Sequence, residues 1–460
     1  MDPGAARRTE LTRDTLRRFV RRGARSSISK LLGKVRPEDV AMSLRGLTPA
    51  ERLAVFRILT HDFPEAAGDV LTELDAAQRN ELLSRVGAEE AAEILERVPV
   101  DDAVYIVEDL PDELRQQVLE IVDLKGTSEV GAQLAYEDDT AGRIMTREFF
   151  SLPASTTVRE AIAAIQENRE AELIFYLYIV GDDGKLVGVT SLRQLLLAHP
   201  SKTLGEIAQR DVIQATTDTD QEEVAQVAAR YDLLAIPVVD EPGKLVGIVT
   251  VDDIVDIVKE EATEDFLRMV GTSEDELAVP ERSFKVAAIR LPWLLINMVG
   301  LILSGILLER FSVTFKEMLF LLTFVPVIMG MAGNSGSQTA TITVRGLATG
   351  RLLPGQGRQR NFLWQQCKVG LTIGLTLGLV VAVVAWLLEN DPAYGLVVAV
   401  SLFCSVVVAS FLGTLIPLVS QRLGVDPAVA AGPLVTTSND ILGLLIYFGF
   451  ASFLITTVVR

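Results

Sequence analysis

Five long apolar stretches follow Arg290, and they restrict the possible folds more than any other feature of the sequence. We place them at about 291–308, 318–343, 369–388, 396–419 and 429–456. A helix needs about 20 apolar residues to cross the hydrocarbon core of a bilayer, and these stretches are close to that length. The sequence therefore predicts a multidomain membrane protein whose C-terminal domain, residues 286–460, has five transmembrane helices.

Charge is distributed very unevenly along the chain. The whole chain has 43 basic and 61 acidic residues, a net charge of −18. Residues 286–460 have 10 basic and 6 acidic residues, and residues 1–36 have 11 basic and 3 acidic residues. Residues 37–285 therefore carry a net −30, from 22 basic and 52 acidic residues. This acidic excess argues against nucleic acid as a partner, because phosphate contacts need Lys and Arg.

Any metal site in this chain must be built from oxygen ligands. The only cysteines are Cys367 and Cys404, and the only histidines are His61 and His199. These numbers exclude a disulfide framework and a thiolate zinc site. Carboxylates, hydroxyls and carbonyls suit hard ions such as Mg²⁺. Because we find neither a nucleophile–base pair nor a metal-hydrolase motif, we do not expect an enzyme.

Basic residues flank the apolar stretches mainly on one side. They are Lys285, Arg290, Arg345, Arg351, Arg358, Arg360, Lys368 and Arg422. The positive-inside rule then places the region before the first span in the cytoplasm. An odd number of spans places the C-terminus outside the plasma (inner) membrane.

The first 137 residues are predicted to be helical. Residues 1–36 form a basic arm whose Arg spacing fits an amphipathic helix for anionic lipid or an acidic face, but we favour a solvated, partly disordered segment. Residues 37–137 have apolar positions at helical spacing, and Pro or Asp recurs at the helix starts. This pattern predicts an all-α N domain built as a stack of short helices.

Residues 138–258 contain an internal repeat with alternating strands and helices. The segment GKLVG occurs at 184–188 and again at 243–247. This α/β pattern resembles a tandem pair of cystathionine-β-synthase (CBS) domains. In such pairs a Thr/Ser-x-x-Asp element binds the ribose of an adenosine nucleotide such as ATP. Thr250 and Asp253 match this element; the first copy has Ser191 and Arg193, but Gln194 replaces the acid.

The segment that follows the repeat is acidic and helical in pattern. We predict one linking helix over 259–285 that continues from the repeat toward the membrane. Asp253, Asp256, Glu260 and Glu264 lie on one face at three- and four-residue spacing. Like charges at this spacing repel, so a neutralising partner is expected.

The second apolar stretch contains an unusual polar segment at 326–350. Pro326, Gly330, Gly333 and Gly336 are expected to interrupt the helix. The interruption would bring polar side chains to membrane depth: Asn334, Ser335, Ser337, Gln338 and Thr339. Irregular polar backbone is tolerated there only beside protein or a water-filled cavity. The alternative is a small-residue face for helix packing.

Asp440 is the only acidic or basic residue between Asp426 and Arg460, and it falls within the fifth span. A carboxylate in a bilayer costs several kcal/mol, so it normally faces a partner or a pathway. We interpret it as part of a cation pathway. Two copies could meet at the axis of a two-fold dimer. The alternative is a protonated Asp440 hydrogen-bonded to Thr436.

The order of these segments, together with 330–350 and 423–448, resembles the MgtE family of magnesium channels. The resemblance implies a homodimer in the lipid bilayer with a central pore gated by its cytoplasmic domains. It assigns Mg²⁺ ligands to Asp440, Asp426, Ala229, Asp232, Asp253, Asp256, Glu261, Glu264, Asp265 and Asp102, with Asp101 and Asp109 nearby. We expect the pore to be lined by Gly330, Asn334, Gln338, Thr436, Thr437 and Asn439. Gly432 departs from some relatives, which carry a polar residue there.

The resemblance implies a magnesium channel that intracellular Mg²⁺ closes. The acidic faces repel at low Mg²⁺, whereas bound ions bridge them at high Mg²⁺ and the linking helix closes the pore. One alternative is a transporter of Co²⁺ or Mn²⁺, which oxygen ligands also accept. Another is a membrane-anchored nucleotide or Mg²⁺ sensor that transports nothing.

Overall fold

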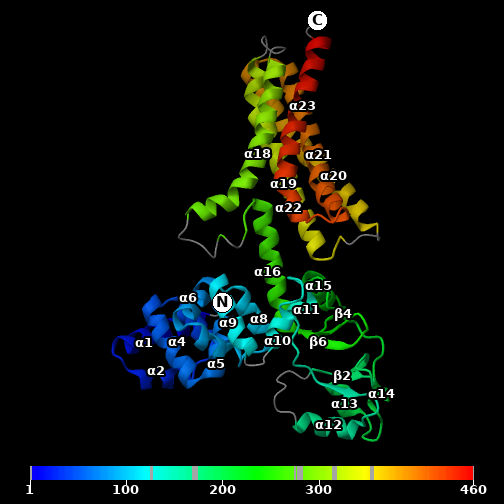
Figure 1. Cartoon of the computed structure of the whole chain (residues 1–460). Coiled ribbons are helices and arrows are strands. Elements are labelled where there is room, and N and C mark those ends of the chain that lie inside the picture. Colours follow the sequence, from blue (N-terminus) through cyan, green and yellow to red (C-terminus); the bar gives the residue numbers. More distant parts are fainter. Residues whose placement is uncertain are drawn as a thin grey trace. The chain divides into compact units, whose positions relative to one another are not determined.

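The structure is a computed structural model that describes residues 3–124, 128–167, 175–273, 276, 283–312, 319–352 and 357–458. It divides into two compact units, Met1–Val258 and Lys259–Arg460. Each unit has hydrophobic clusters of its own. The boundary falls within helix α16 (Val251–Val270), which continues from the first unit into the second. Figure 1 labels many of the elements of both units.

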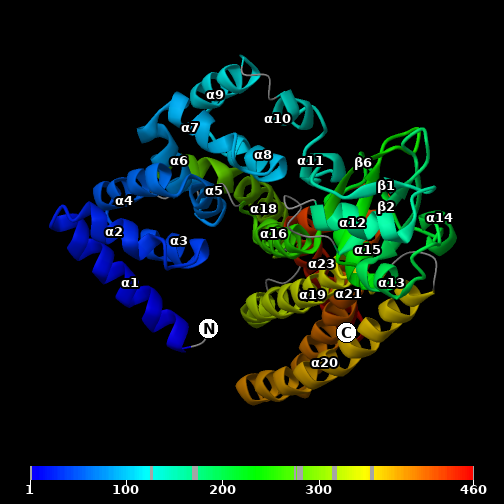
Figure 2. The same ribbon diagram turned by 90° about the horizontal axis from the view of Figure 1, so that it is seen from below.

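The first unit begins with a run of short helices. In chain order the described ones are α1 (Pro3–Arg21), α2 (Arg25–Leu32), α3 (Pro37–Arg45), α4 (Pro49–Asp62), α5 (Pro64–Thr72), α6 (Ala76–Val86), α7 (Ala88–Leu95), α8 (Val100–Glu108), α9 (Asp112–Leu124) and α10 (Ser128–Gln133). Figure 2 shows them following one another from α1 to α10. The starts of these helices follow from local sequence. At α4, for example, Thr48 and Glu51 form a capping box, and Pro49 is the first helical residue. The predicted helical N domain is confirmed.

The basic arm is helical and belongs to the core of this domain. Leu16 of α1 and Ile28 of α2 are almost completely buried. The Nε atoms of Arg17 and Arg21 lie 3.4 and 3.2 Å from the carboxylate of Glu51. The preferred expectation of a solvated, partly disordered arm is therefore wrong for the described part of it. Composition shows the positive charge but not the acidic partner that α4 supplies.

The rest of the first unit contains two small sheets. The elements are α11 (Ala141–Ile144), β1 (Ser151–Pro153), α12 (Val158–Glu167), β2 (Tyr176–Val180), β3 (Leu186–Ser191), α13 (Leu192–Leu197), α14 (Leu204–Ile207), β4 (Ala215–Thr216), α15 (Gln221–Tyr231), β5 (Ala235–Val239), β6 (Leu245–Thr250) and the start of α16. The sheets have the orders β1-β2-β3 and β4-β5-β6, each with one parallel and one antiparallel pair. Both registers shift at equivalent positions, Ile179/Val180 and Val238/Val239.

The two GKLVG segments pair with each other and join the two copies. The N–H of Leu186 donates to the carbonyl of Gly243 (3.1 Å), and the N–H of Leu245 donates to the carbonyl of Gly184 (3.2 Å). Gly184 and Gly243 have φ values of +77° and +88°, which favour glycine. The repeat seen in the sequence is thus a structural repeat, and the predicted CBS pair is confirmed.

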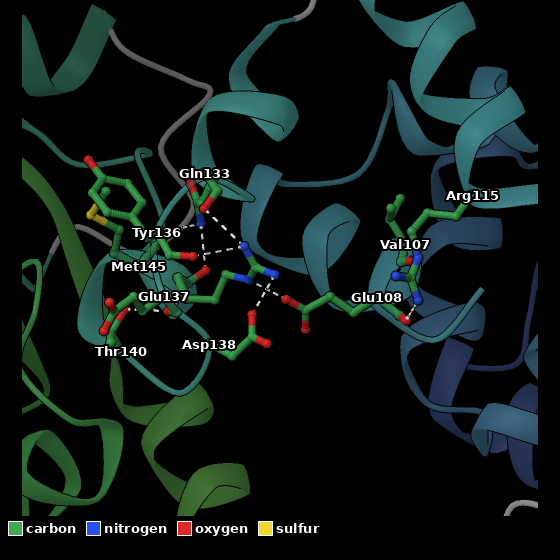
Figure 3. A network of polar contacts seen from close by, with 10 residues as sticks. Val107, Glu108, Arg115, Gln133, Tyr136, Glu137, Asp138, Thr140 and Met145 are labelled. Atoms are coloured by element: carbon green, nitrogen blue, oxygen red, sulfur yellow. Dashed lines mark hydrogen bonds and ion pairs between the residues drawn. The ribbon is translucent and has the colours of Figure 1, made fainter. Parts of the chain in front are cut away.

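Arg143 connects the N domain to the start of the CBS pair. Figure 3 shows the surrounding network with Glu108, Gln133 and Asp138. Its Nε atom donates to Glu108 at the end of α8, and its Nη2 atom donates to Asp138 (2.8 Å). The Nε2 atom of Gln133 donates in turn to the carbonyls of Arg143 (3.0 Å) and Met145 (2.7 Å). Burial raises the pKa of Glu108, while Arg143 opposes that change. This contact uses a protein cation to hold the two domains together.

The second unit holds the apolar helices. After the end of α16 they are α18 (Ser283–Ser312), the 3₁₀ turn η1 (Leu319–Phe324), α19 (Val325–Ala348), α20 (Arg358–Glu389), α21 (Pro392–Arg422), α22 (Pro427–Ala431) and α23 (Pro433–Val458). Within the described residues, five helical segments are long and apolar enough to cross a membrane. Close packing uses glycine: a Cβ on Gly374 or Gly378 of α20 would meet the carbonyls of Phe403 and Ala399. The predicted five-helix domain is confirmed.

Two predicted details of this unit are wrong. Helix α19 continues through Gly330, Gly333 and Gly336 without interruption, because glycine weakens a helix without breaking it when neighbouring helices pack against it. The acidic linking helix does not extend over 259–285 but ends at Val270, where Gly271 has φ +79°. Residues 274–275 and 277–282 of the predicted linker lie outside the described residues.

Candidate functional site

Asp440 lies two turns into α23, which begins at a break in the chain direction. Gly432 has φ −73° and ψ −90° and separates α22 from α23, and Pro433 is the first residue of the new helix. The side chain of Asp440 is half-buried. The hydroxyl of Thr436 donates to the carbonyl of Gly432 (3.0 Å), and among the described residues no hydrogen bond joins Thr436 to Asp440. The alternative in which Thr436 holds a protonated Asp440 therefore gains no support from this geometry.

Helix α19 exposes a polar stripe on the surface of this membrane unit. Gly330, Asn334 and Gln338 follow one another at four-residue spacing, and Ser337 and Thr341 lie beside them; all five are exposed. Exposed polar side chains are unfavourable against lipid and normally face another protein surface or water. The stripe is therefore a polar face of α19 that the described residues of this chain leave exposed.

The opposite face of α19 is also polar, but it is satisfied within the chain. The hydroxyls of Ser335 and Ser410 lie 3.0 Å apart, which joins α19 to α21. The hydroxyls of Thr339 and Thr343 donate to backbone carbonyls one turn earlier in α19. These contacts fit the small-residue packing alternative for the buried face only, because they do not involve the exposed stripe.

Two of the residues predicted to line a pore, Asn439 and Thr437, contact neighbouring helices within this chain. Asn439 is only 2% exposed and packs so closely on Gly336 of α19 that a Cβ there would collide with its amide. Thr437 lies against Gly300 of α18 in the same way. Both side chains therefore contribute to helix packing around Asp440. The glycine contact from α18 could not be recognised from the sequence pattern.

A cavity of about 470 Å³ lies beside the break at Gly432. Its walls are Met269, Val270, Gly271, Thr272, Arg290, Trp293, Leu294, Asn297, Ser337, Ala340, Thr341, Ala431, Gly432, Pro433 and Thr436. Ser337 and Thr341 of the polar stripe thus share one cavity with Thr436, one turn before Asp440. The end of α16 forms another wall, so this helix can influence the polar space between α19 and α23.

Gly432 is required for this contact. A Cβ on Gly432 would lie 2.7 Å from the carbonyl oxygen of Met269 in the last turn of α16. The side chain of Met269 packs on a small cluster that includes Ala340, Ala428 and Val435. In the sequence, Gly432 is notable only because some relatives carry a polar residue at this position. Its packing against α16 becomes visible only in the structure.

The first acidic junction consists of Asp101 and Asp102 of α8 and Asp253 of α16. Burial, followed by the charges of Asp253 and Asp102, raises the pKa of Asp101 to about 8. Burial and Asp253 raise the pKa of Asp102 to about 7, whereas Arg79 opposes the change. Burial also raises the pKa of Asp253 to about 6. Within the described residues one buried oxygen of Asp101 has no hydrogen-bond partner.

Asp253 is also part of the predicted nucleotide element. The hydroxyl of Thr250 donates to the Asp253 carboxylate (2.6 Å) at the start of α16. In the first copy Ser191 and Gln194 form a capping box instead, and Arg193 is exposed. The residue that replaces the acid therefore caps a helix, which needs no charge.

The other residues of the first unit that the resemblance assigns to Mg²⁺ or places near it are Ala229, Asp232, Asp256 and Asp109; of these, Asp256 lies close enough to Asp253 for its charge to raise the pKa of Asp253. Ala229 and Asp232 are exposed at the end of α15, where Asp232 adopts the left-handed conformation with φ +53°. Asp256 is exposed on α16. Asp109 has a structural partner, since its carboxylate lies 2.9 Å from the buried guanidinium of Arg79.

The second acidic junction lies where the end of α16 meets the start of α22. One oxygen of Asp426 accepts from the N–H of Ala428 (2.7 Å) and caps α22, and the other accepts from Nη1 of Arg268 (2.5 Å). The Nη2 atom of Arg268 also forms an ion pair with Glu264. Burial, then the charge of Asp426, raises the pKa of Asp265 to about 6.

Neither junction is a ready-made metal cage. Within the described residues, no three His, Cys, Asp or Glu side chains are grouped closely enough to hold a metal ion. The oxygen-only donors and the unpartnered oxygen of Asp101 nevertheless fit a hydrated Mg²⁺, which keeps most of its waters and needs only one or two carboxylates.

Family models match most of the chain after residue 34, with the longest unmatched stretch at 261–324. The model described as a divalent cation transporter, MgtE, matches residues 325–450. The model of the MgtE intracellular N domain matches residues 35–139, and the CBS domain model matches 141–200 and 204–260.

Known relatives match this chain over more than two thirds of their length. The chain is 38% identical over 318 residues to the magnesium transporter MgtE of Bacillus subtilis, covering 69% of this chain and 70% of the relative. It is 38% identical over 346 residues to the magnesium transporter MgtE of Thermus thermophilus, covering 75% and 76%. The fold and these matches define a transporter class that joins a CBS pair to a membrane domain. The chain belongs to the MgtE family.

Two solved structures resemble the first unit. The soluble part of a magnesium transporter is 30% identical, covers 55% of this chain and 99% of that one, and has a TM-score of 0.50. The cytosolic domain of the Mg²⁺ channel MgtE in complex with ATP is 34% identical, covers 53% and 99%, and also has a TM-score of 0.50. These likenesses support the fold of slightly more than half of the chain.

Proposed function

We propose that this chain is a magnesium-selective channel for Mg²⁺ uptake across the plasma membrane. It works as a homodimer, with the N-terminal domains in the cytoplasm and the C-terminus outside. Intracellular Mg²⁺ closes it by binding to the acidic cytoplasmic domains. The relatives named as magnesium transporters support the substrate.

The exposed polar stripe of α19 beside the Asp440 helix carries this proposal. A membrane anchor gains nothing from Asn334 and Gln338 on its surface or from a carboxylate within a span, because both cost free energy in lipid. A second copy that covers this face converts the same groups into the wall of an aqueous pathway. The alternative of a sensor without transport leaves this stripe unexplained.

Magnesium suits the pathway because one carboxylate and neutral oxygen groups are enough to hold a hydrated ion. Asp440 supplies the charge, and Thr436 with the stripe residues supplies hydroxyl and amide oxygens. Oxygen donors also accept Mn²⁺, so transport of Mn²⁺ or Co²⁺ is the second candidate. A hydrated-ion mimic separates the two, since it blocks a pore that passes hydrated Mg²⁺.

Closure follows from the same acids. Bridging ions neutralise the carboxylates of the acidic junctions and favour the compact arrangement, which shifts the equilibrium toward the closed state. Asp232 and Asp256, which are exposed, and Glu261, which is partly buried, contribute further negative charge to this response. An adenosine nucleotide binds at Thr250 and Asp253, as the relative solved with ATP suggests.

The test is Mg²⁺ uptake by the full-length protein in liposomes. Replacing Asp440 by Asn removes the only intramembrane charge of α23, and we expect uptake to fall at least about tenfold, the order of one lost charge contact. The matched control is Asp391→Asn, because Asp391 caps α21 and Asn caps equally well. Uptake in Asp440→Asn equal to that in the control would refute the pathway.

A further inference from the structure

The end of α16 carries a basic residue among acids that the family resemblance assigns to regulatory Mg²⁺. Arg268 occupies the last turn of α16, and its guanidinium contacts both Asp426 and Glu264. The second contact follows the i, i+4 spacing of a helix, but the first joins residues 158 positions apart. One side chain therefore bridges two carboxylates from different helices, as a bridging metal ion does.

The surrounding charges explain why the guanidinium remains there. Glu261 and Glu264 of α16 act on Arg268 together with Asp426. Burial lowers the pKa of Arg268, but the hydrogen bond to Asp426 and these acidic charges raise it by more. The net pKa is therefore raised, and the guanidinium stays protonated. Arg345 of α19 adds a second positive charge that acts on Asp265.

The geometry of Asp426 leaves little room for a further ligand interaction. One carboxylate oxygen is committed to the first turn of α22 and the other to Arg268. An ion that coordinates the second oxygen must displace the guanidinium or share it. The planar fork of Arg suits two carboxylates, whereas the point charge of Lys suits one.

We propose that Arg268 is a tethered competitor of regulatory Mg²⁺ at the contact between α16 and α22. Its guanidinium occupies Asp426 and Glu264 when Mg²⁺ is scarce, and it raises the Mg²⁺ concentration needed for closure. This inference rests on the proposed closure of the channel by cytoplasmic Mg²⁺. Arg268 thereby sets the range of Mg²⁺ concentration over which the channel closes, and it does so from outside the ion pathway.

The experiment measures Mg²⁺ flux in liposomes while Mg²⁺ is titrated on the side of the N-terminal domains. Each inhibition midpoint is normalised to the flux of that variant without Mg²⁺ on that side. In Arg268→Gln we expect the midpoint to fall about three- to fivefold, the effect of removing a partly exposed ion pair of up to about 1 kcal/mol. Arg268→Lys keeps the charge and should give an intermediate midpoint.

Two controls make the outcome specific. Lys259→Gln removes the other basic residue of α16 and should leave the midpoint within twofold of the parent, roughly the scatter between independent sites. Asp426→Asn combined with Arg268→Gln should be non-additive, because the two side chains share one contact. A midpoint that is unchanged in Arg268→Gln, or that rises because Arg268 instead latches the closed state, overturns the inference. Absence of inhibition in the parent protein would refute the proposed closure itself.

Discussion

The two ends of α16 meet their neighbours through acidic junctions of opposite electrostatic design. At its start Asp253 faces Asp101 and Asp102, and the pKa values of all three are raised to between about 6 and 8. At its end Asp426 and Glu264 share the guanidinium of Arg268. The three residues of the first junction include no cation, and Arg79 only partly offsets their repulsion, whereas the second junction carries its own cation. The contact at the start of α16 should therefore respond more strongly to added cations than the contact at its end.

The largest expected effect tests the need for an external cation at the first junction. Replacing Asp101 and Asp102 by Asn removes two carboxylates that repel Asp253 while keeping their shape. We expect the contact between α8 and α16 to form without Mg²⁺ at pH 8, and added Mg²⁺ to change it little. The measurement is the distance between spin labels on these helices in the full-length protein. Asp112→Asn, an exposed acid of the N domain, is the control; equal Mg²⁺ responses in control and variant would contradict the assignment.

The second prediction concerns pH at the same junction. The buried contact raises the pKa of Asp101 and Asp102 above the ordinary value of 3.8, so the contact binds protons that separated carboxyls release. Its stability is therefore greatest at low pH and falls as the pH rises from about 4 through about 8. Without Mg²⁺, the same labels should be closer at pH 6 than at pH 8. A spacing that is constant with pH, or that shortens as the pH rises, would break the comparison.

The third and smallest expected effect concerns the second junction. A Cβ on Gly432 would lie 2.7 Å from the Met269 carbonyl, so Gly432→Ala must push the end of α16 away. Overpacking of this kind costs about 1–3 kcal/mol, so we expect the Mg²⁺ concentration for closure to rise about fivefold. Gly449→Ala of α23 is the control, since nothing lies within 4 Å of a Cβ there. Identical midpoints for the two variants would show that this contact plays no part in closure.

Most of the architecture could be predicted from local sequence patterns. Apolar length identified the five spans, and the repeated GKLVG segments identified the CBS pair, because both are encoded by neighbouring residues. The helical arm was missed because its stability depends on Glu51, which lies about 30 positions away. The continuous α19 was missed because glycine and proline spacing alone does not reveal the packing that supports a helix.

The candidate site could be predicted only in part for the same reason. Asp440 was conspicuous as a lone charge in an apolar span. The bridge from Arg268 to Asp426 joins residues 158 positions apart, and no spacing rule connects them. The different orientations of Asn439 and Asn334 also depend on which helices pack against α23 and α19. Residue type suggested the chemistry, whereas the fold decided which groups meet.

The central claim is that this chain passes Mg²⁺ and that acidic contacts along α16 close it. The most direct measurement is Mg²⁺ flux through the purified protein in liposomes, with Mg²⁺ titrated on the side of the N-terminal domains. We predict that flux in the parent falls as Mg²⁺ rises, and that the variant with Asn at positions 101 and 102 loses most of this dependence. Flux that does not respond to Mg²⁺ in the parent, or an identical response in the variant, would contradict the account.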